Sequence, residues 1–138
     1  MLHQQDETDK TVFVAMPFSV KYFKIFSSVI EPACLEINAR CIRIDNKSYT
    51  GDIVSEIKKE IKKCKLVIAD LSESRPNVFF EIGFATGKGK PIIQICSTSL
   101  ADIPFDVRND NTIDYKLRSK TKLLNRLIFA LKEIIPIP

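Results

Sequence analysis

The chain has 138 residues, of which 45% are hydrophobic and 28% charged, and its formal net charge is +4. This composition is typical of one globular domain and excludes a disordered, fibrous or low-complexity protein. Lysines and arginines are mixed with acidic residues rather than gathered in an arm, so strong nucleic-acid binding is not indicated.

The cysteines, Cys34, Cys41, Cys64 and Cys96, are far apart and form no CxxC pair, and the single histidine is His3. We therefore expect reduced cysteines, no metal site and no cofactor. No run reaches the 18 apolar residues of a membrane span, and the polar, acidic start is unlike a signal peptide. These features predict a cytoplasmic protein without membrane partners.

We divide the chain into a polar leader over residues 1–10 and one domain over residues 11–138. The β-branched and apolar run from Thr11 to Phe18 predicts a strand buried on both faces. Apolar residues at helical spacing then predict a helix from Tyr22 to Ile37, which Pro32 must kink or restart.

The segment from Cys41 to Asp45 predicts a second strand, and a polar turn containing Gly51 follows. Apolar residues at helical spacing predict a helix from Asp52 to Cys64. We interpret its many lysines as the solvent face of an amphipathic helix, with a phosphate-binding patch as the alternative. A third strand is predicted from Leu66 to Asp70.

The second half of the chain continues the alternation. We predict a helix from Asn77 to Lys88, a strand from Pro91 to Cys96, a short strand from Thr112 to Lys116, and a last helix from Lys120 to Ile135. Alternating strands and helices joined by right-handed crossovers specify an α/β fold. We expect a flavodoxin-like or Rossmann-like three-layer sandwich around a five-stranded, mostly parallel sheet.

Ligands of such sheets bind beyond the carboxyl ends of the strands, near the point where strand order reverses. The residues that the predicted elements bring to this edge are Pro17, Phe18, Ser19, Asp45, Asp70, Leu71 and Cys96. Asp70 and Asp45 have two interpretations there, because an aspartate after a strand either caps the following turn or projects into the cleft.

Glu81 is a lone carboxylate in the apolar helical segment VFFEIGFA. No cation lies three or four residues away, and Asn77 lies four residues upstream, where a capping box needs three. One structural interpretation remains, a solvent-facing stripe with Asn77 and Lys88. Because Phe80 and Phe84 border this stripe, we expect the carboxylate at the edge of an apolar pocket, where desolvation raises its pKa.

Two glycines, Gly83 and Gly87, interrupt the same helix at a cost of roughly 1 kcal/mol each relative to alanine. Either close approach of a backbone or ligand, or tight packing of the helix on the sheet, would offset this cost. The GKGK segment that follows is interpreted as a helix end. The start of the helix, with Ser72, Ser74 and Arg75, is the candidate anion site.

The segments VFVAMPFS, RID and LVIADLSESRPNVFFEIGFATGKGKPII together resemble the superfamily that joins nucleoside 2-deoxyribosyltransferases to bacterial TIR-like domains. The resemblance implies that Glu81 is the catalytic glutamate of the family's (F/Y)EhGhA motif, with h apolar. It implies that Asp70, the aspartate of ADL, orients the sugar or base. The residues assigned to substrate binding are Met16, Pro17, Phe18, Ser19, Tyr22, Asp45, Ser72, Ser74, Arg75 and Asn77.

The resemblance also implies an activity, cleavage of the N-glycosidic bond of NAD or of a (deoxy)nucleotide by hydrolysis or transfer. The segment from Ser74 to Asn77 lacks an acidic residue that the transferases usually carry, which speaks against base exchange. The PNVFFE form is more similar to TIR-like members that act on nucleotides such as NAD in antiviral defence, often as homo-oligomers. The alternative is a non-catalytic nucleotide-binding or self-assembling module.

Overall fold

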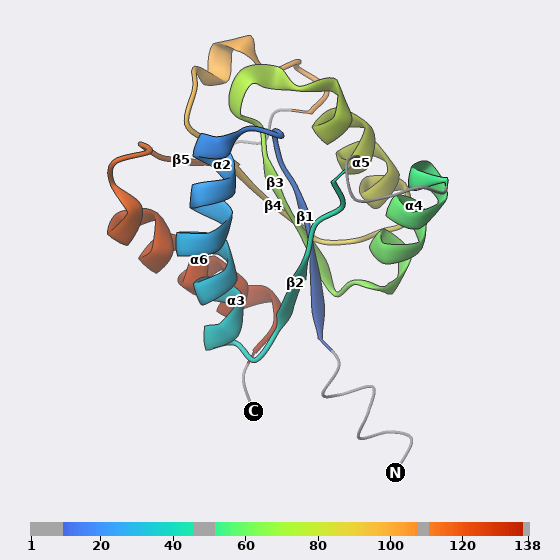
Figure 1. The fold of residues 1–138 in the computed structure, drawn as a ribbon, viewed down its shortest axis with the longest axis horizontal. Coiled ribbons are helices and arrows are strands. Elements are labelled where there is room, and N and C mark those ends of the chain that lie inside the picture. The colour runs from blue at the N-terminus through green and yellow to red at the C-terminus, as the bar shows by residue number, and fades with distance from the viewer. Residues whose placement is uncertain (1–9, 46–51, 108–110, 137–138) are drawn as a thin grey trace.

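The chain forms a five-stranded sheet with helices on both faces, as the computed structural model shows for residues 10–45, 52–107 and 111–136 (Figure 1). The strand order is β2-β1-β3-β4-β5 and every neighbouring pair is parallel. This arrangement confirms the predicted flavodoxin-like or Rossmann-like sandwich. The strands are β1 (Thr11–Ala15), β2 (Arg40–Ile42), β3 (Leu66–Asp70), β4 (Ile92–Cys96) and β5 (Ile113–Asp114).

The helices lie in two layers. One layer contains α2 (Val20–Ile25), the π-helical segment η1 (Phe26–Ile30), α3 (Glu31–Glu36) and α6 (Lys120–Ile134). The other contains α4 (Ile53–Lys63) and α5 (Pro76–Gly87), on the opposite face of the sheet (Figure 1). Two short 3-10 turns, η3 (Ser72–Ser74) and η4 (Leu100–Asp102), follow β3 and β4.

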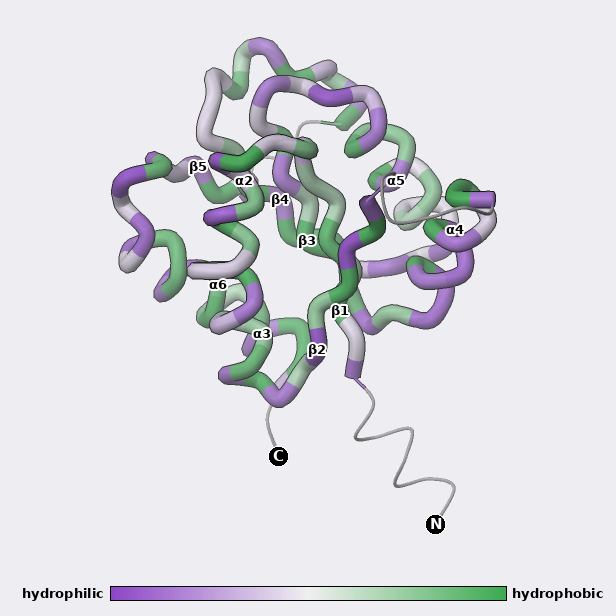
Figure 2. The backbone as a smooth tube through the Cα atoms, in the orientation of Figure 1, coloured by the Kyte–Doolittle hydropathy of each residue, from purple (hydrophilic) through white to green (hydrophobic). Residues whose placement is uncertain are grey.

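Alternation along each strand divides the core between the two layers. In β1, Val12 and Val14 pack with the α2, α3 and α6 layer, and Phe13 and Ala15 pack with the α4 and α5 layer. Figure 2 accordingly shows mostly hydrophobic central strands and a mostly hydrophilic α4. Since α4 buries only isoleucines against the sheet, its lysines form the solvent face, as predicted.

Pro32 does not end the first helix. The chain is helical from Val20 to Glu36, and the π-helical segment η1 directly precedes the turn that contains Pro32. Proline fits the first turn of a helical segment because no intrahelical N–H bond is lost there. The α-helix therefore restarts in the turn that contains Pro32, which is one of the two outcomes that we expected, and a π-helical segment precedes the restart.

Three predicted strands are too long at their ends. β1 ends at Ala15 rather than Phe18, because Pro17 has no N–H to continue the ladder. β2 ends at Ile42 rather than Asp45, because its pairing with β1 stops at Phe13. β5 is only two residues long, since its pairing with β4 ends at Asp114.

Several predictions concern the chain around the sheet. All four cysteines are free thiols, and three of them are buried while Cys41 is half-buried. Within the described residues, no helix is both long and apolar enough to cross a membrane. The predicted leader up to Asp9 and the predicted turn at Gly51 lie outside the described residues.

Candidate functional site

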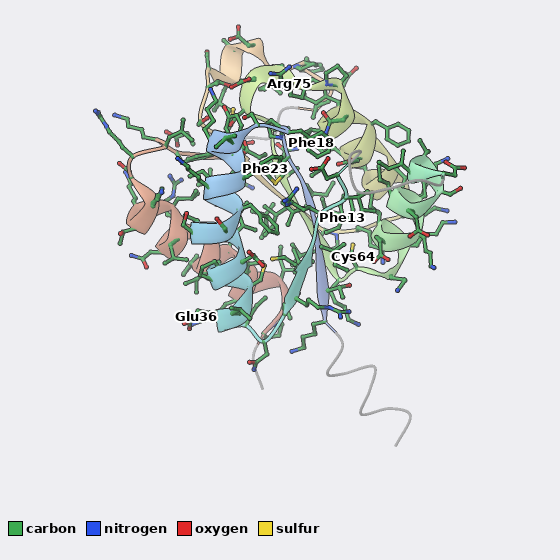
Figure 3. All side chains as sticks on the ribbon, in the orientation of Figure 1. Phe13, Phe18, Phe23, Glu36, Cys64 and Arg75 are labelled. Atoms are coloured by element: carbon green, nitrogen blue, oxygen red, sulfur yellow. The ribbon has the colours of Figure 1, made fainter. Side chains whose placement is uncertain are left out.

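The predicted site residues meet at the carboxyl edge of the sheet. The strand order reverses between β1 and β3, and their carboxyl ends lie side by side. Figure 3 shows Phe18, which follows β1, and Arg75, which follows β3, at this end of the sheet, with Glu36 at the opposite end. The loops after β1, β3 and β4 therefore surround one region.

Glu81 is buried on α5, with 3% of its surface exposed. Its carboxylate has no hydrogen bond or ion pair within the described part of the chain. Desolvation alone raises the pKa of Glu81 to about 8. The solvent-facing stripe is therefore wrong, because a carboxylate on a wet face would be exposed and would titrate near its usual pKa of 4.5.

Packing of α5 explains why this carboxyl is buried. Val78, Ile82 and Ala85 fix the helix on the face formed by alternate residues of β1 and β3. Asn77 lies one turn before Glu81 on the same side of the helix, and its Nδ2 donates to the carbonyl oxygen of Met16 at 3.3 Å. The side of α5 that carries Glu81 therefore adjoins the carboxyl end of β1.

The glycines of α5 are not explained by packing. Among the described residues, a Cβ atom added at Gly83 or Gly87 would meet no group outside the helix backbone within 4 Å, and both residues are exposed. Tight packing on the sheet is therefore wrong as the reason for these glycines. Close approach of a ligand remains a prediction. The GKGK segment does end the helix, and Gly89 adopts a φ of 70° there.

Asp70 is also buried, but its carboxylate is fully engaged. Oδ1 accepts from the Ser72 backbone N–H at 3.0 Å and from the Ser72 hydroxyl at 2.5 Å. Oδ2 accepts from the Tyr115 hydroxyl at 2.7 Å. Burial raises the pKa of Asp70, and these hydrogen bonds oppose the shift. The geometry is that of a residue that shapes the turn after β3.

The two carboxylates come from opposite faces of the sheet. Leu66 and Ile68 of β3 pack with the α2 and α6 layer, and Asp70 continues this alternation to reach Tyr115. Glu81 belongs to α5 on the other face. They do not form a hydrogen-bonded pair, so any joint action requires a ligand that extends across the ends of the strands.

A polar network continues from Asp70 across the edge of the sheet. The Ser72 hydroxyl accepts from the Ser97 backbone N–H at 2.8 Å and lies 2.8 Å from the Ser97 hydroxyl. The Ser97 hydroxyl oxygen in turn lies 3.4 Å from the hydroxyl oxygen of Tyr22. Ser72 has no exposed surface. Its hydroxyl therefore holds the turn after β3 and the loop after β4 together through its hydrogen bonds.

Glu73 sits at the outer end of this network and binds three donors. Its carboxylate accepts from the Lys21 ammonium at 2.7 Å, from the Tyr22 hydroxyl at 3.0 Å and from an Arg75 guanidinium nitrogen at 2.9 Å. These donors hold the pKa of Glu73 low, at about 2, with Lys21 the largest contributor. Arg75, which we assigned to a substrate anion, is thus paired with a carboxylate of the chain.

The backbone at Glu73 is held in an uncommon conformation. Glu73 and the next residue, Ser74, have φ values of 64° and 50°, and left-handed conformations cost of order 1–2 kcal/mol for each non-glycine residue. Two bonds to the loop after β4 oppose this cost. The Glu73 N–H donates to the Thr98 hydroxyl at 3.0 Å, and the Ser74 hydroxyl donates to the Asp102 carbonyl at 3.1 Å.

The remaining predicted residues surround the end of β1. Met16 and Pro17 are buried, and Phe18 is 38% exposed. The Ser19 hydroxyl precedes α2 and is buried without a hydrogen-bond partner among the described residues. Asp45 lies beyond β2, where Arg43 pairs with it at 3.8 Å.

Sequence reasoning missed four residues of this region, namely Lys21, Glu73, Ser97 and Tyr115. Each acts through a partner in a distant part of the chain, as in the bond of Tyr115 to Asp70, 45 residues away. No local pattern marks such pairs. Among the described residues, no cluster of three or more histidines, cysteines and acidic residues gathers where it could hold a metal ion.

The comparisons with known proteins relate the fold of this chain to solved structures only. No protein-family model matches the chain, and no curated protein matches it in sequence. The structure of the CMP N-glycosidase BcmB of Clostridium botulinum is similar, with a TM-score of 0.68 and 24% identity over 88% of this chain and 100% of that one.

A second similar structure is that of the fungal multi-domain GH3 β-N-acetylglucosaminidase with a GCN5-related glucosamine N-acetyltransferase region. Its TM-score is 0.58 at 21% identity, and the match covers 93% of this chain but only 15% of that one. At these identities the likeness shows a common fold, and the chain is thus built on the scaffold that BcmB also uses.

Proposed function

We propose that this protein cleaves the N-glycosidic bond of a nucleotide, with Glu81 as the catalytic residue. The observation that carries the proposal is a buried carboxyl without a partner among the described residues, with a pKa raised to about 8, at the carboxyl edge of an open parallel sheet. NAD and (deoxy)nucleotides are the candidate substrates. The fold shared with a CMP N-glycosidase supports a nucleoside monophosphate among them.

The chemistry follows from the charge that develops on the sugar. As the bond between C1′ and the base nitrogen breaks, its electron pair leaves with the base and positive charge forms at C1′. The ionised Glu81 carboxylate either attacks C1′ or stabilises this charge. Water then supplies the oxygen bound to C1′, and its released proton balances the proton taken up by the base.

Burial determines how often Glu81 is ionised, and only the ionised carboxylate can attack C1′ or stabilise its positive charge. With a pKa of about 8, most of the empty protein carries a protonated Glu81 at pH 7. A nearby positive charge favours the ionised form, so the developing cation lowers this pKa during the reaction. The desolvated carboxylate interacts with that cation more strongly than an exposed one would.

The other residues of the edge have supporting roles in this proposal. Asp70 positions the turn after β3, which carries Ser74 and Arg75 to the start of α5. These two residues are near the phosphate in the proposed complex. Phe18 and Tyr22, which precede and begin the first helix, border the base or sugar.

The test is chromatography of purified protein with NAD, nucleosides and nucleoside monophosphates. We expect release of the free base from one of these, a loss of at least about 10³-fold in kcat for Glu81→Gln, and a kcat/KM that rises with pH up to about 8. Glu36→Gln, which removes an exposed carboxylate at the opposite end of the sheet, is the control. Equal product traces for the wild type and Glu81→Gln would exclude a catalytic role for Glu81.

A second candidate function is a non-catalytic module that binds a nucleotide or assembles with its own copies. The observation that favours it is the exposure of large apolar side chains, including Phe105 at 84% and Phe129 at 69%. Calorimetry with nucleotides and light scattering separate the two candidates. Binding or assembly without base release at any protein concentration supports the module.

A further inference from the structure

We propose that Glu73 determines substrate specificity, because its carboxylate occupies the phosphate subsite of the empty protein and must be displaced by a phosphomonoester. This inference rests on the proposed function and narrows its substrate class to nucleoside monophosphates. It assigns the subsite to three donors, Lys21, Tyr22 and Arg75, of which Lys21 was not among the predicted site residues.

The donors around Glu73 form an anion-binding site, and the Glu73 carboxylate is the anion bound in it. Two cations and one hydroxyl converge on a single carboxylate within 2.7–3.0 Å. A phosphomonoester carries more negative charge than a carboxylate and has three oxygens to accept from these donors. The same three donors therefore suit a phosphate better than they suit Glu73.

The subsite adjoins the start of the helix that carries Glu81. Arg75 precedes α5 and Glu81 lies six residues further along, which corresponds to about 9 Å at 1.5 Å per residue. The proposal requires a ribose 5′-phosphate to reach from the donors around Glu73 to Glu81, with its anomeric carbon against the Glu81 carboxylate.

Glu73 is able to leave the subsite. About a quarter of its side chain (26%) is exposed, so rotation about the side-chain bonds can carry the carboxylate into solvent. The loop itself need not move, because backbone and hydroxyl bonds to Thr98 and Asp102 hold it independently of the carboxylate. An uncharged nucleoside offers no group to replace Glu73, so its binding leaves the contacts of Lys21 and Arg75 unchanged.

The kinetic test compares CMP with cytidine as matched probes for the wild type, Glu73→Gln and Lys21→Ala. Glu73→Gln keeps the shape of the side chain but removes the competing charge, so we expect KM for CMP to fall about tenfold. Lys21→Ala should raise KM for CMP at least about tenfold. Neither variant should change KM for cytidine, and Lys24→Ala, which removes an exposed charge from the same helix, should change neither KM.

A binding test separates this inference from the proposed function. Calorimetry with inorganic phosphate on the wild type and on Glu73→Gln needs no turnover, and thermal unfolding of each variant verifies that it is folded. Tighter phosphate binding by folded Glu73→Gln supports the inference even if no base is ever released. Base release from CMP, with phosphate affinity and KM unchanged or weakened in folded Glu73→Gln, overturns the inference and leaves the proposed function intact.

Discussion

At the scale of single residues, the site contains two buried carboxylates in contrasting environments. Asp70 accepts three hydrogen bonds from Ser72 and Tyr115, whereas Glu81 accepts none within the described part of the chain. A buried carboxyl without partners is held in its neutral form by desolvation. This difference supports the proposal in which Asp70 shapes the turn after β3 and Glu81 acts on the substrate.

The raised pKa of Glu81 predicts a dependence of stability on pH. The unfolded chain releases this proton near pH 4.5, whereas the folded protein retains it up to about pH 8. The folded state thus binds more protons within that window. The free energy of unfolding should therefore fall as pH rises through it, by up to about 1.4 kcal/mol per pH unit from this group.

Glu81→Gln removes the titrating carboxyl and with it this fall in the free energy of unfolding. As pH rises from 4.5 to 8, the variant should therefore become progressively more stable relative to the wild type. Urea unfolding at several pH values measures the difference. Glu36→Gln controls for the loss of one carboxyl group at an exposed position. A constant difference between the wild type and Glu81→Gln across this range would contradict the assigned desolvation.

At the scale of elements, α5 combines two properties that oppose each other. Val78, Ile82 and Ala85 hold it firmly on the sheet, yet the helix contains two glycines that no neighbouring side chain explains. Glycine lowers helix stability, and the sequence retains it in the helix that carries Glu81. A helix optimised for stability alone would have alanine at both positions.

Gly83→Ala should therefore raise the free energy of unfolding by up to about 1 kcal/mol, because the added methyl group meets nothing beyond the helix backbone within 4 Å in the described part of the chain. Gly89→Ala is the contrasting variant. Its backbone has a φ of 70°, which strains a residue with a Cβ atom, so this variant should be less stable than the wild type. Denaturant unfolding of both variants measures the two changes.

The effect of Gly83→Ala on the ligand distinguishes the two explanations of this glycine. If a ligand approaches the helix at Gly83, the stabilised variant should bind nucleotides more weakly than the wild type. Unchanged nucleotide affinity would show that the space beside Gly83 is not used.

At the scale of the whole molecule, a buried hydrogen bond connects the edge strand β5 to the central strand β3. Tyr115 follows β5, the short last strand, and donates to Asp70 at the end of the central strand β3. β5 itself pairs over only two residues. The buried hydrogen bond of Tyr115 therefore joins its backbone bond to Cys96, the contacts of Arg126 with Asp114 and apolar packing in placing α6 beside the sheet.

Tyr115→Phe tests this connection. The variant keeps the ring in the core but leaves Asp70 Oδ2 without its donor, so we expect a loss of about 1–3 kcal/mol in the free energy of unfolding. Phe129→Leu on the exposed face of α6 is a control for an aromatic change in the same region. A loss below about 0.5 kcal/mol in Tyr115→Phe would show that the bond does not support the fold.

The sequence by itself determined the parallel α/β sheet, the end of β3 at Asp70 and the placement of Glu81 in an apolar helix. These features follow from local periodicity, because strands and helices bury residues at spacings that the chain displays directly. Strand ends at β1 and β2 were less predictable, since they depend on where pairing with a neighbour stops.

Only the tertiary structure decided how the polar side chains are used. It buried Glu81 with no partner in the described part of the chain, directed Asp70 to Tyr115, and placed Glu73 among donors from α2 and from the residue before α5. Hydrogen bonds and ion pairs join residues that are distant in sequence, and no local pattern encodes such a pairing. Desolvation, too, depends on everything packed around a group, so the sequence predicted the direction of the pKa shift of Glu81 but not its extent.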